Sequence, residues 1–121
     1  MATILVAEDD PDILHVLRDL LIKHGYTVIG APDGMKALEI CNEQPDRINL
    51  VITGIHMPVM NGIELGEQLA THHPHLKVIY SSATPKKMLK LNEDCVFLVK
   101  PFTEEMLLSA VNSALQGTSK I

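Results

Sequence analysis

Short apolar runs alternate along the chain with longer stretches in which apolar residues recur every three or four positions. The short runs are rich in β-branched residues and predict strands, whereas the longer spacing predicts amphipathic helices. The predicted strands cover residues 3–7, 26–29, 50–53, 76–81 and 96–99. The predicted helices run from 11 to 24, from about 34 to 42, from 62 to 73, from about 85 to 91, and from 103 to 116.

Local signals mark the ends of several of these helices. Asp10 is placed to cap the first helix, with Pro11 at its first position, and Gly25 is placed to end it. Thr103 begins the last helix, where Glu104 and Glu105 suit the positive end of the helix dipole. The first buried stripe is predicted to hold Ile13, Val16, Leu17, Leu20 and Leu21, and the last one Met106, Leu107, Ala110, Val111, Ala114 and Leu115.

Five strands that alternate with five helices predict a parallel sheet covered on both faces, because parallel strands need crossover connections. The expected fold class is therefore a doubly wound α/β domain. Residues 1–121 contain no repeat and no linker, so we expect a single domain that ends in a polar tail over 117–121. In such sheets, ligands bind outside the carboxyl ends of the strands.

Composition narrows the function further. The chain is 46% apolar and 21% charged, which excludes intrinsic disorder, and its net charge of −5 argues against a nucleic-acid-binding surface. No apolar run approaches the roughly 20 residues of a membrane span, and no basic patch marks a signal peptide. We therefore expect a soluble, cytoplasmic protein with neither nucleic acid nor membrane as a partner.

The cysteines and histidines do not predict a redox or metal site. Cys41 and Cys95 lack the spacing of a metal-binding or redox motif, so both are expected to be buried thiols. His72, His73 and His75 are interrupted by a proline, and adjacent helical residues point in different directions. A solvated helix end is the better interpretation of this histidine cluster.

Polar residues follow the predicted strands at their carboxyl ends. Glu8 and Asp9 come after the first strand, Ser82 after the fourth, and Lys100 after the fifth. Two carboxylates suit Mg²⁺, which takes one or two of them and keeps several waters. A hydroxyl and an ammonium beside a metal would hold a phosphoryl group, whose oxygens need hydrogen-bond donors and charge neutralisation.

Three motifs make the sequence recognisable. The segments 4–11 (ILVAEDDP), 57–62 (MPVMNG) and 99–102 (VKPF) resemble the signatures of response regulator receiver domains. The resemblance covers nearly the whole chain and implies a flavodoxin-like receiver fold with five strands in the order 2-1-3-4-5. In that family, a sensor kinase passes a phosphoryl group to an aspartate at the end of the third strand, with Mg²⁺ alongside.

The resemblance also implies a role for individual residues. Glu8 and Asp9 would be the acidic metal pair, and His56 would offer its backbone carbonyl to the ion. Ser82 would be the switch hydroxyl and Lys100 the phosphate-binding lysine. The aromatic switch would be Phe97, and the peptide bond before Pro101 would be cis.

One position departs from the family pattern. The phosphoacceptor aspartate should stand four residues before Pro58, where this chain has Gly54. Glycine has no nucleophilic side chain, so phosphorylation at this position is chemically impossible. Thr53 and Ser81 should point away from the site by strand alternation, and Ser82 is a poor substitute acceptor. Mg²⁺ should bind weakly or not at all.

The connection between Ser82 and Lys100 is also short. After a strand of about five residues, about twelve remain for a loop, a helix and a second loop. The fourth helix should therefore have two turns at most, as in receivers of hybrid sensor kinases.

Several functions remain open at this stage. The first hypothesis is a non-enzymatic receiver module that acts by binding proteins. The second hypothesis is a single-substitution variant of an ordinary phosphoacceptor receiver. Expected partners are a histidine kinase, a phosphotransfer protein or a separate effector, and the expected state is a monomer or weak dimer. A flavodoxin-like FMN carrier is less suitable, because acidic residues follow the first strand and the chain has no tryptophan. An independent hydrolase would lack an acid, base and nucleophile.

Overall fold

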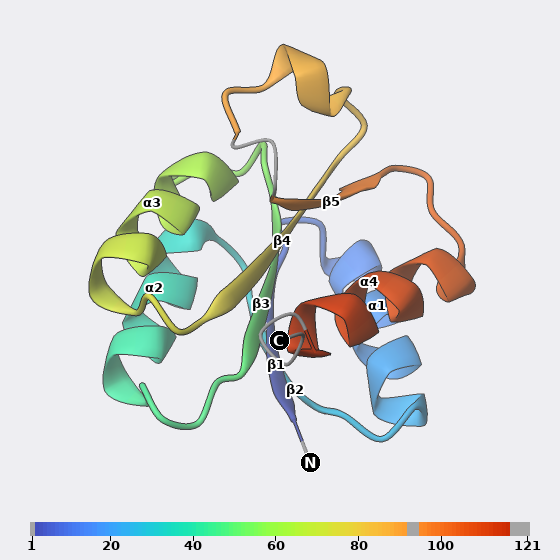
Figure 1. Cartoon of the computed structure of the whole chain (residues 1–121), viewed down its shortest axis with the longest axis horizontal. Helices are drawn as coiled ribbons and strands as arrows, with labels where there is room; N and C mark the ends of the chain where they lie inside the picture. Colours follow the sequence, from blue (N-terminus) through green and yellow to red (C-terminus); the bar gives the residue numbers. More distant parts are fainter. Residues whose placement is uncertain (1, 92–94, 117–121) are drawn as a thin grey trace.

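Five parallel strands form the central sheet of the computed structural model, which describes residues 2–91 and 95–116 (Figure 1). The strands are β1 (Thr3–Ala7), β2 (Thr27–Ala31), β3 (Leu50–Gly54), β4 (Lys77–Ser82) and β5 (Val96–Val99). Their order, β2-β1-β3-β4-β5, is the one that the receiver resemblance implies. The predicted strands were correct to within two residues at each end, and the polar tail over 117–121 lies outside the described residues.

Helices cover both faces of this sheet. They are α1 (Pro11–Lys23), α2 (Gly34–Glu43), α3 (Gly62–His72) and α4 (Glu104–Gln116). Alternate residues of the strands pack toward opposite sides, so Ile4 joins a core with α1 and α4, and Leu5 joins a core with α2 and α3. The central strands are therefore buried on both faces, which explains their continuous apolar runs.

The prediction of five helices was wrong by one element. In the part of the chain that the structure describes between β4 and β5, a single 3-10 turn, η1 (Lys86–Met88), replaces the expected helix. The connection is near the minimum length for a crossover that contains a packed helix, and Pro85 restricts the backbone at its start.

The buried stripes of two helices are narrower than predicted. Val16 of α1 is 57% exposed and Met106 of α4 is 46% exposed, although both were expected to be buried. Each immediately precedes a buried residue, Leu17 or Leu107, and neighbouring helical positions point about 100° apart. In each pair of neighbours, only one side chain can therefore face the sheet.

The predicted helix caps are present. The Asp10 side chain accepts hydrogen bonds from the backbone of Asp12 and Ile13, at 2.9 and 3.4 Å. Gly25, with φ +94°, follows α1 in the left-handed conformation that favours glycine. The Asp10 contacts therefore fix the start of α1, and Gly25 allows the chain to turn away after its end.

The predictions for cysteine and histidine were partly wrong. Cys41 is buried, and burial raises its pKa to about 11, but Cys95 lies before β5 and is only half-buried. His73 is buried rather than solvated, because its ring pairs with the Asn42 side chain at 2.8 Å. Among the described residues, no helix is both long enough and apolar enough to span a membrane.

Candidate functional site

The carboxyl ends of four strands meet at one edge of the sheet. Gly54 is the last residue of β3 and pairs in register with Ser81, and Ser82 is the last residue of β4. The backbone N–H of Lys100 donates to the Ser82 carbonyl at 2.9 Å, so the end of β5 lies beside the end of β4. Glu8 directly follows β1, the neighbour of β3. Parallel pairing therefore brings together residues that are far apart in sequence.

Glu8 and Lys100 form an ion pair at this edge. Lys100 Nζ lies 3.3 Å from Glu8 Oε1, while Glu8 Oε2 accepts a hydrogen bond from the Asp10 N–H at 3.1 Å. The Glu8 side chain is 6% exposed and that of Lys100 is 28% exposed. A carboxylate this deeply buried needs such partners, because an unpaired charge is costly to remove from water.

Glu8 and Asp9 are the carboxylates that could hold a metal at this edge of the sheet. Glu8 already contacts an ammonium group, and Asp9 is exposed. No group of three or more acidic, histidine or cysteine side chains suited to a metal occurs within residues 2–91 and 95–116. Mg²⁺ takes one or two carboxylates and keeps several waters, so an ion held by Glu8 and Asp9 would compete with Lys100 for the Glu8 carboxylate.

A Cβ at position 54 would make ordinary van der Waals contacts beside Glu8. An ideal Cβ at position 54 would lie 3.7 Å from Glu8 Oε1 and 3.8 Å from Met57 Cγ, which are ordinary van der Waals distances. The backbone of Gly54 is not in the left-handed region that favours glycine. A Cβ therefore fits at this position without backbone strain, and its nearest neighbour is the Glu8 carboxylate.

Ser82 belongs to a second polar group. Its buried Oγ accepts a hydrogen bond from the Thr84 N–H at 3.0 Å, and Thr84 Oγ1 lies 3.2 Å from His56 Nε2. The contact connects the loop after β3 with the loop after β4. Because Ser82 uses its oxygen as an acceptor, its hydroxyl proton is available to a further acceptor.

Phe97 lies within β5, in register with Tyr80, and Pro101 follows Lys100 beyond the strand. Phe97 is half-buried and lines a shallow hollow with Met106 and Ala110 of α4. The Lys100–Pro101 peptide bond is cis. Thr53 and Ser81, which were not expected to serve the site, are both buried, and Thr53 Oγ1 donates to the Gly54 carbonyl at 2.8 Å.

Thr84 and the Asp10 backbone contact the site residues although neither had a predicted role there. Thr84 stands two residues after Ser82, which is the spacing of a turn closed by a serine hydroxyl, and this signal was available in the sequence. Nothing comparable in the sequence predicts the hydrogen bond from the Asp10 N–H to Glu8, because that bond depends on how the Glu8 side chain is oriented.

The chain matches known proteins over nearly its full length. Residues 4–112 match the family model described as response regulator receiver domain. The chain is 34% identical to the response regulator receiver protein CpdR of Brucella abortus, covering 95% of this chain and 98% of that protein. It is 33% identical to the 3′,5′-cyclic-nucleotide phosphodiesterase regA of Dictyostelium discoideum, covering 94% of this chain. That alignment spans 15% of the phosphodiesterase.

A solved structure supports the same grouping. The receiver domain protein of Clostridium thermocellum is 29% identical to this chain, with a TM-score of 0.89 and coverage of 98% of both chains. The likeness therefore extends from the three motifs to the arrangement of the entire sheet.

Proposed function

The chain belongs to the family of response regulator receiver domains, and from this premise we propose that it is a receiver module that accepts no phosphoryl group at position 54. Receiver domains act in two-component signalling, where they interact with histidine kinases, phosphotransfer proteins and effectors. In this proposal the module acts by binding such a protein, and it has no catalytic residue of its own. One observation carries the proposal: Gly54 stands at the end of β3, where the family places the acceptor aspartate.

The groups around Gly54 support a specific assignment of roles. Ser82 and Lys100 would contact phosphoryl oxygens in a phosphorylated relative, and Glu8 would join Asp9 and the backbone carbonyl of His56 at a metal. In this chain, Lys100 instead neutralises Glu8 at 3.3 Å. Both charges thereby have a partner without a phosphate, which limits the cost of burying Glu8.

Two consequences follow for the metal and for the aromatic switch. Mg²⁺ would bind weakly or not at all, since the third carboxylate is absent and Glu8 is already paired.

Phe97 would keep its orientation, because no phosphoryl oxygen draws Ser82 inward. Beryllofluoride should therefore leave the amide NMR signals near Ser82 and Phe97 unchanged, since it needs an aspartate to mimic an acyl phosphate.

A second candidate function is favoured by the absence of a steric clash for an added Cβ at position 54. Gly54 would then be a single substitution in an otherwise ordinary phosphoacceptor receiver. The nearest atoms to an added Cβ lie at 3.7 Å or more, so the backbone leaves room for the first atom of an aspartate side chain. The retention of Glu8, Ser82 and Lys100 also suits this candidate.

The experiment that tests both candidates compares the parent chain with Gly54→Asp and Gly54→Asn. Each protein is incubated with acetyl phosphate and Mg²⁺, and its intact mass is measured. In the aspartate variant, a carboxylate oxygen attacks phosphorus, the phosphorus–oxygen bond to acetate breaks, and acetate leaves with the bonding electrons. The product is a mixed anhydride that hydroxylamine cleaves. The asparagine variant controls for the size of the new side chain.

The possible outcomes are distinct. If only Gly54→Asp carries phosphate, the pocket is functional apart from position 54. That outcome supports the second candidate. Phosphate on none of the three proteins favours a binding module whose pocket has diverged beyond position 54. Hydroxylamine-labile phosphate on the parent chain contradicts the assignment of Gly54 altogether.

A further inference from the structure

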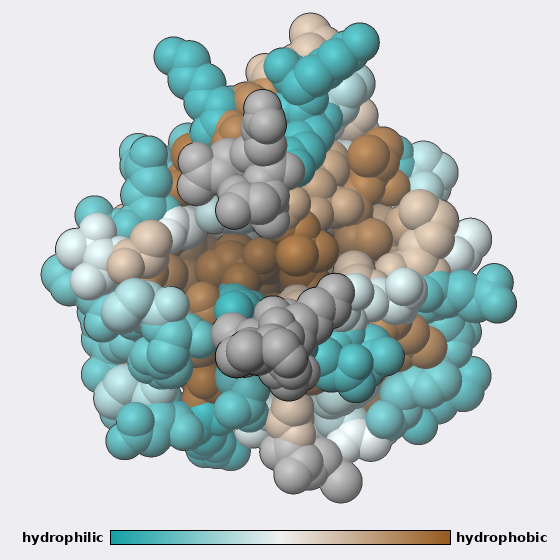
Figure 2. All heavy atoms as spheres, viewed as in Figure 1, coloured by the Kyte–Doolittle hydropathy of each residue, from teal (hydrophilic) through white to brown (hydrophobic). Residues whose placement is uncertain are grey.

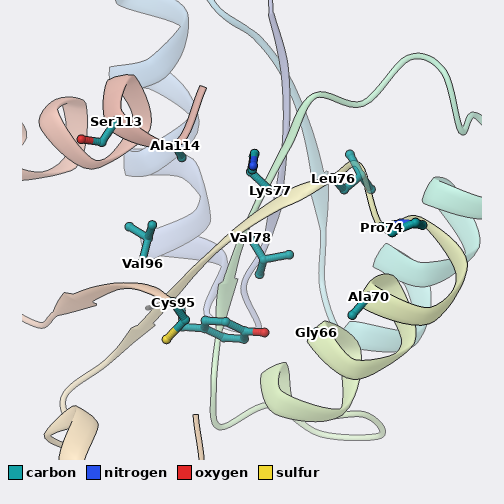
Figure 3. A pocket seen from close by; sticks show the side chains of 11 residues that line it. Gly66, Ala70, Pro74, Leu76, Lys77, Val78, Cys95, Val96, Ser113 and Ala114 are labelled. Atoms are coloured by element: carbon teal, nitrogen blue, oxygen red, sulfur yellow. The ribbon is translucent and has the colours of Figure 1, made fainter. Parts of the chain in front are cut away.

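The two outer strands of the sheet, β2 and β5, differ in how their free edges are protected. Beside β5, Lys86 Nζ donates to the Cys95 carbonyl at 3.2 Å, so a side chain occupies a backbone acceptor next to the start of the strand. Figure 3 shows Cys95 and Val96 beside a cavity of about 690 Å³, and Figure 2 shows hydrophobic residues in this hollow. The strand has four residues and is followed by Lys100 and Pro101, residue types that limit the pairing of an edge with another chain.

Strand β2 forms the other edge and lacks these protective residues. It pairs with β1 alone, on one side. The sequence from 25 to 32 contains no charged residue, and its one proline, Pro32, comes after the end of the strand. Gly30 is exposed and carries no side chain that would hold another backbone away. Natural edge strands usually carry a charge, a proline or a bulge that prevents pairing, so the edge of β2 is open to a further strand.

The backbone groups of β2 point alternately toward β1 and away from it. The Thr27 N–H donates to a carbonyl before β1 at 3.1 Å, and the Ala31 carbonyl accepts from the Glu8 N–H at 3.0 Å. The odd-numbered residues of β2 therefore bond to β1, and the N–H and C=O groups of Val28 and Gly30 point outward. Each of these two residues offers one donor and one acceptor at the edge.

The free donors end on both sides of this pair. The Tyr26 N–H donates to the Leu21 carbonyl at 3.1 Å, and Pro32 has no N–H. Within residues 26–32, the outward donors are thus those of Val28 and Gly30. A matching strand needs two donors and two acceptors at the same spacing, and β2 itself provides them.

We propose that the edge of β2 pairs with the β2 edge of a second copy of this chain, in antiparallel register about a two-fold axis at Ile29. In this register, Val28 of each copy lies opposite Gly30 of the other, and the two residues exchange both of their N–H···O=C bonds. Tyr26 of one copy then lies opposite Pro32 of the other, where neither residue has an N–H to leave unpaired. All of the outward donors of the edge are therefore used.

The side chains of β2 are complementary to one another in this register. An ideal Cβ at Gly30 would lie 3.3 Å from the methyl carbons of Leu14, on the α1 face of the sheet. Val28 of the second copy would occupy this face beside Gly30 and Leu14, so a large residue faces a small one. Ile29 packs on the opposite face and would meet its own copy across the axis. This fit of a large residue to a small one favours a second copy as the occupant.

The charges near β2 are compatible with self-association. The chain has a net charge of −5, but the paired segments carry none of it, so no like charges lie opposite each other. Both flanking helices pack against β2. Helix α1 carries two basic and two acidic residues, and α2 carries one basic and two acidic residues. Two short strands bury less than the roughly 1,200 Å² of a stable complex, so we expect a weak, reversible dimer.

The dimer does not depend on whether position 54 can carry phosphate. Strand β1 separates β2 from β3, whose last residue is Gly54, so the strand-end site stays accessible in the paired form. A failure of this proposal would therefore leave the proposed function unaffected.

The first test measures the unmodified chain. Sedimentation from about 10 µM to about 1 mM should show a reversible monomer–dimer equilibrium. Amide hydrogen exchange at Val28 and Gly30 should slow by about tenfold or more over the same range, because both N–H groups become hydrogen-bonded in the dimer. A chain that stays monomeric at the highest concentration, or exchange at these two amides that does not respond to concentration, would overturn the proposal.

Matched variants then identify the edge. Val28→Pro removes the outward N–H without removing a bond to β1, and should weaken the dimer by about tenfold or more. Val28→Thr keeps the N–H and the side-chain shape, and should stay within about threefold of the parent. Val99→Pro is the control on the opposite edge, because Val99 is exposed and it is the next residue whose N–H bonds to β4. A dimer that Val99→Pro abolishes and Val28→Pro retains would assign self-association to β5 and contradict the proposal.

The register is tested with a mixture of carbon-13-labelled and unlabelled chains. The antiparallel pair brings the two Ile29 α-protons close together across the axis, so an intermolecular nuclear Overhauser effect should join them. Another register, or contacts confined to the helices, would overturn the pairing described here. The competing occupant is an extended segment of a different protein. A parent chain that is monomeric at about 1 mM would leave the edge to such a segment and reject the second copy.

Discussion

Lys100 Nζ lies 3.3 Å from Glu8 Oε1, so a residue after β5 neutralises a buried carboxylate that follows β1. The two residues are separated by β3 and β4 in the sheet order. Their contact joins the end of β1 to the end of β5, past Gly54 at the end of β3. Both charged side chains therefore have a partner without a ligand. The stability of the fold should therefore depend on this pair.

Replacing Lys100 with methionine should lower the free energy of unfolding by about 1–3 kcal/mol, because the buried Glu8 carboxylate loses its ammonium partner. The partial exposure of Lys100 puts the expected loss at the lower end of that range. Urea denaturation at neutral pH measures it. Lys87→Met, an exposed control, should change stability by about 0.5 kcal/mol at most. An equal loss in both variants would mean that the ion pair contributes nothing.

An aspartate at position 54 should make stability depend on Mg²⁺. Its carboxylate would extend toward Glu8 Oε1 from a Cβ 3.7 Å away, and like charges at such a distance cost on the order of 1 kcal/mol or more. Thermal melts should show Gly54→Asp destabilised in EDTA and restored by Mg²⁺, with Gly54→Asn indifferent to the ion. The parent should respond little, and sub-micromolar Mg²⁺ affinity in the parent by calorimetry would refute this account.

Ser81 and Ser82 should respond oppositely to loss of their hydroxyl groups. Ser81 Oγ is buried and has no hydrogen-bond partner among the described residues, whereas Ser82 Oγ accepts from the Thr84 N–H. Ser81→Ala should raise the free energy of unfolding by about 1 kcal/mol, since an unsatisfied buried hydroxyl is removed. Ser82→Ala should lower it by about the same amount. Chemical denaturation of the two variants side by side distinguishes this result from a uniform effect.

The interaction of α1 with α4 should be weakened by acid. A hydrogen bond from His24 holds the pKa of Glu104 below its ordinary value of 4.5, with a smaller contribution from Lys23. Because the folded state lowers this pKa, the stabilisation is complete above about 4.5 and is lost as the pH falls through the lowered folded value. Carbon-13 NMR titration of Glu104 should show its pKa rise more in His24→Gln than in Lys23→Gln.

The two thiols should react at different rates. Burial raises the pKa of Cys41 to about 11, so little thiolate forms at neutral pH, and its side chain is inaccessible. Cys95 is only half-buried, and it lines a cavity together with residues of α3 and α4. Iodoacetamide under native conditions should modify Cys95 first, as followed by peptide mass mapping. Comparable rates for the two residues would show that Cys41 is exposed by local opening.

Much of the fold could be predicted because it depends on local patterns. The apolar runs gave the strands to within two residues, and Asp10, Pro11 and Gly25 marked the ends of the first helix correctly. Exposure was predicted less well, as Val16 and Met106 show. Helical periodicity defines an apolar stripe, but the sheet and the neighbouring helix decide how wide a stripe is covered.

The sequence by itself determined which chemical groups the chain carries at its strand ends, and above all that Gly54 offers no nucleophile. Tertiary structure alone decided how those groups are used. Lys100 pairs with Glu8, and Ser82 with the Thr84 N–H, because parallel pairing of β1, β3, β4 and β5 brings distant residues within contact. It also decided that the described residues between β4 and β5 form only the turn η1, since a helix forms in a crossover only where enough residues are available to pack it on the sheet.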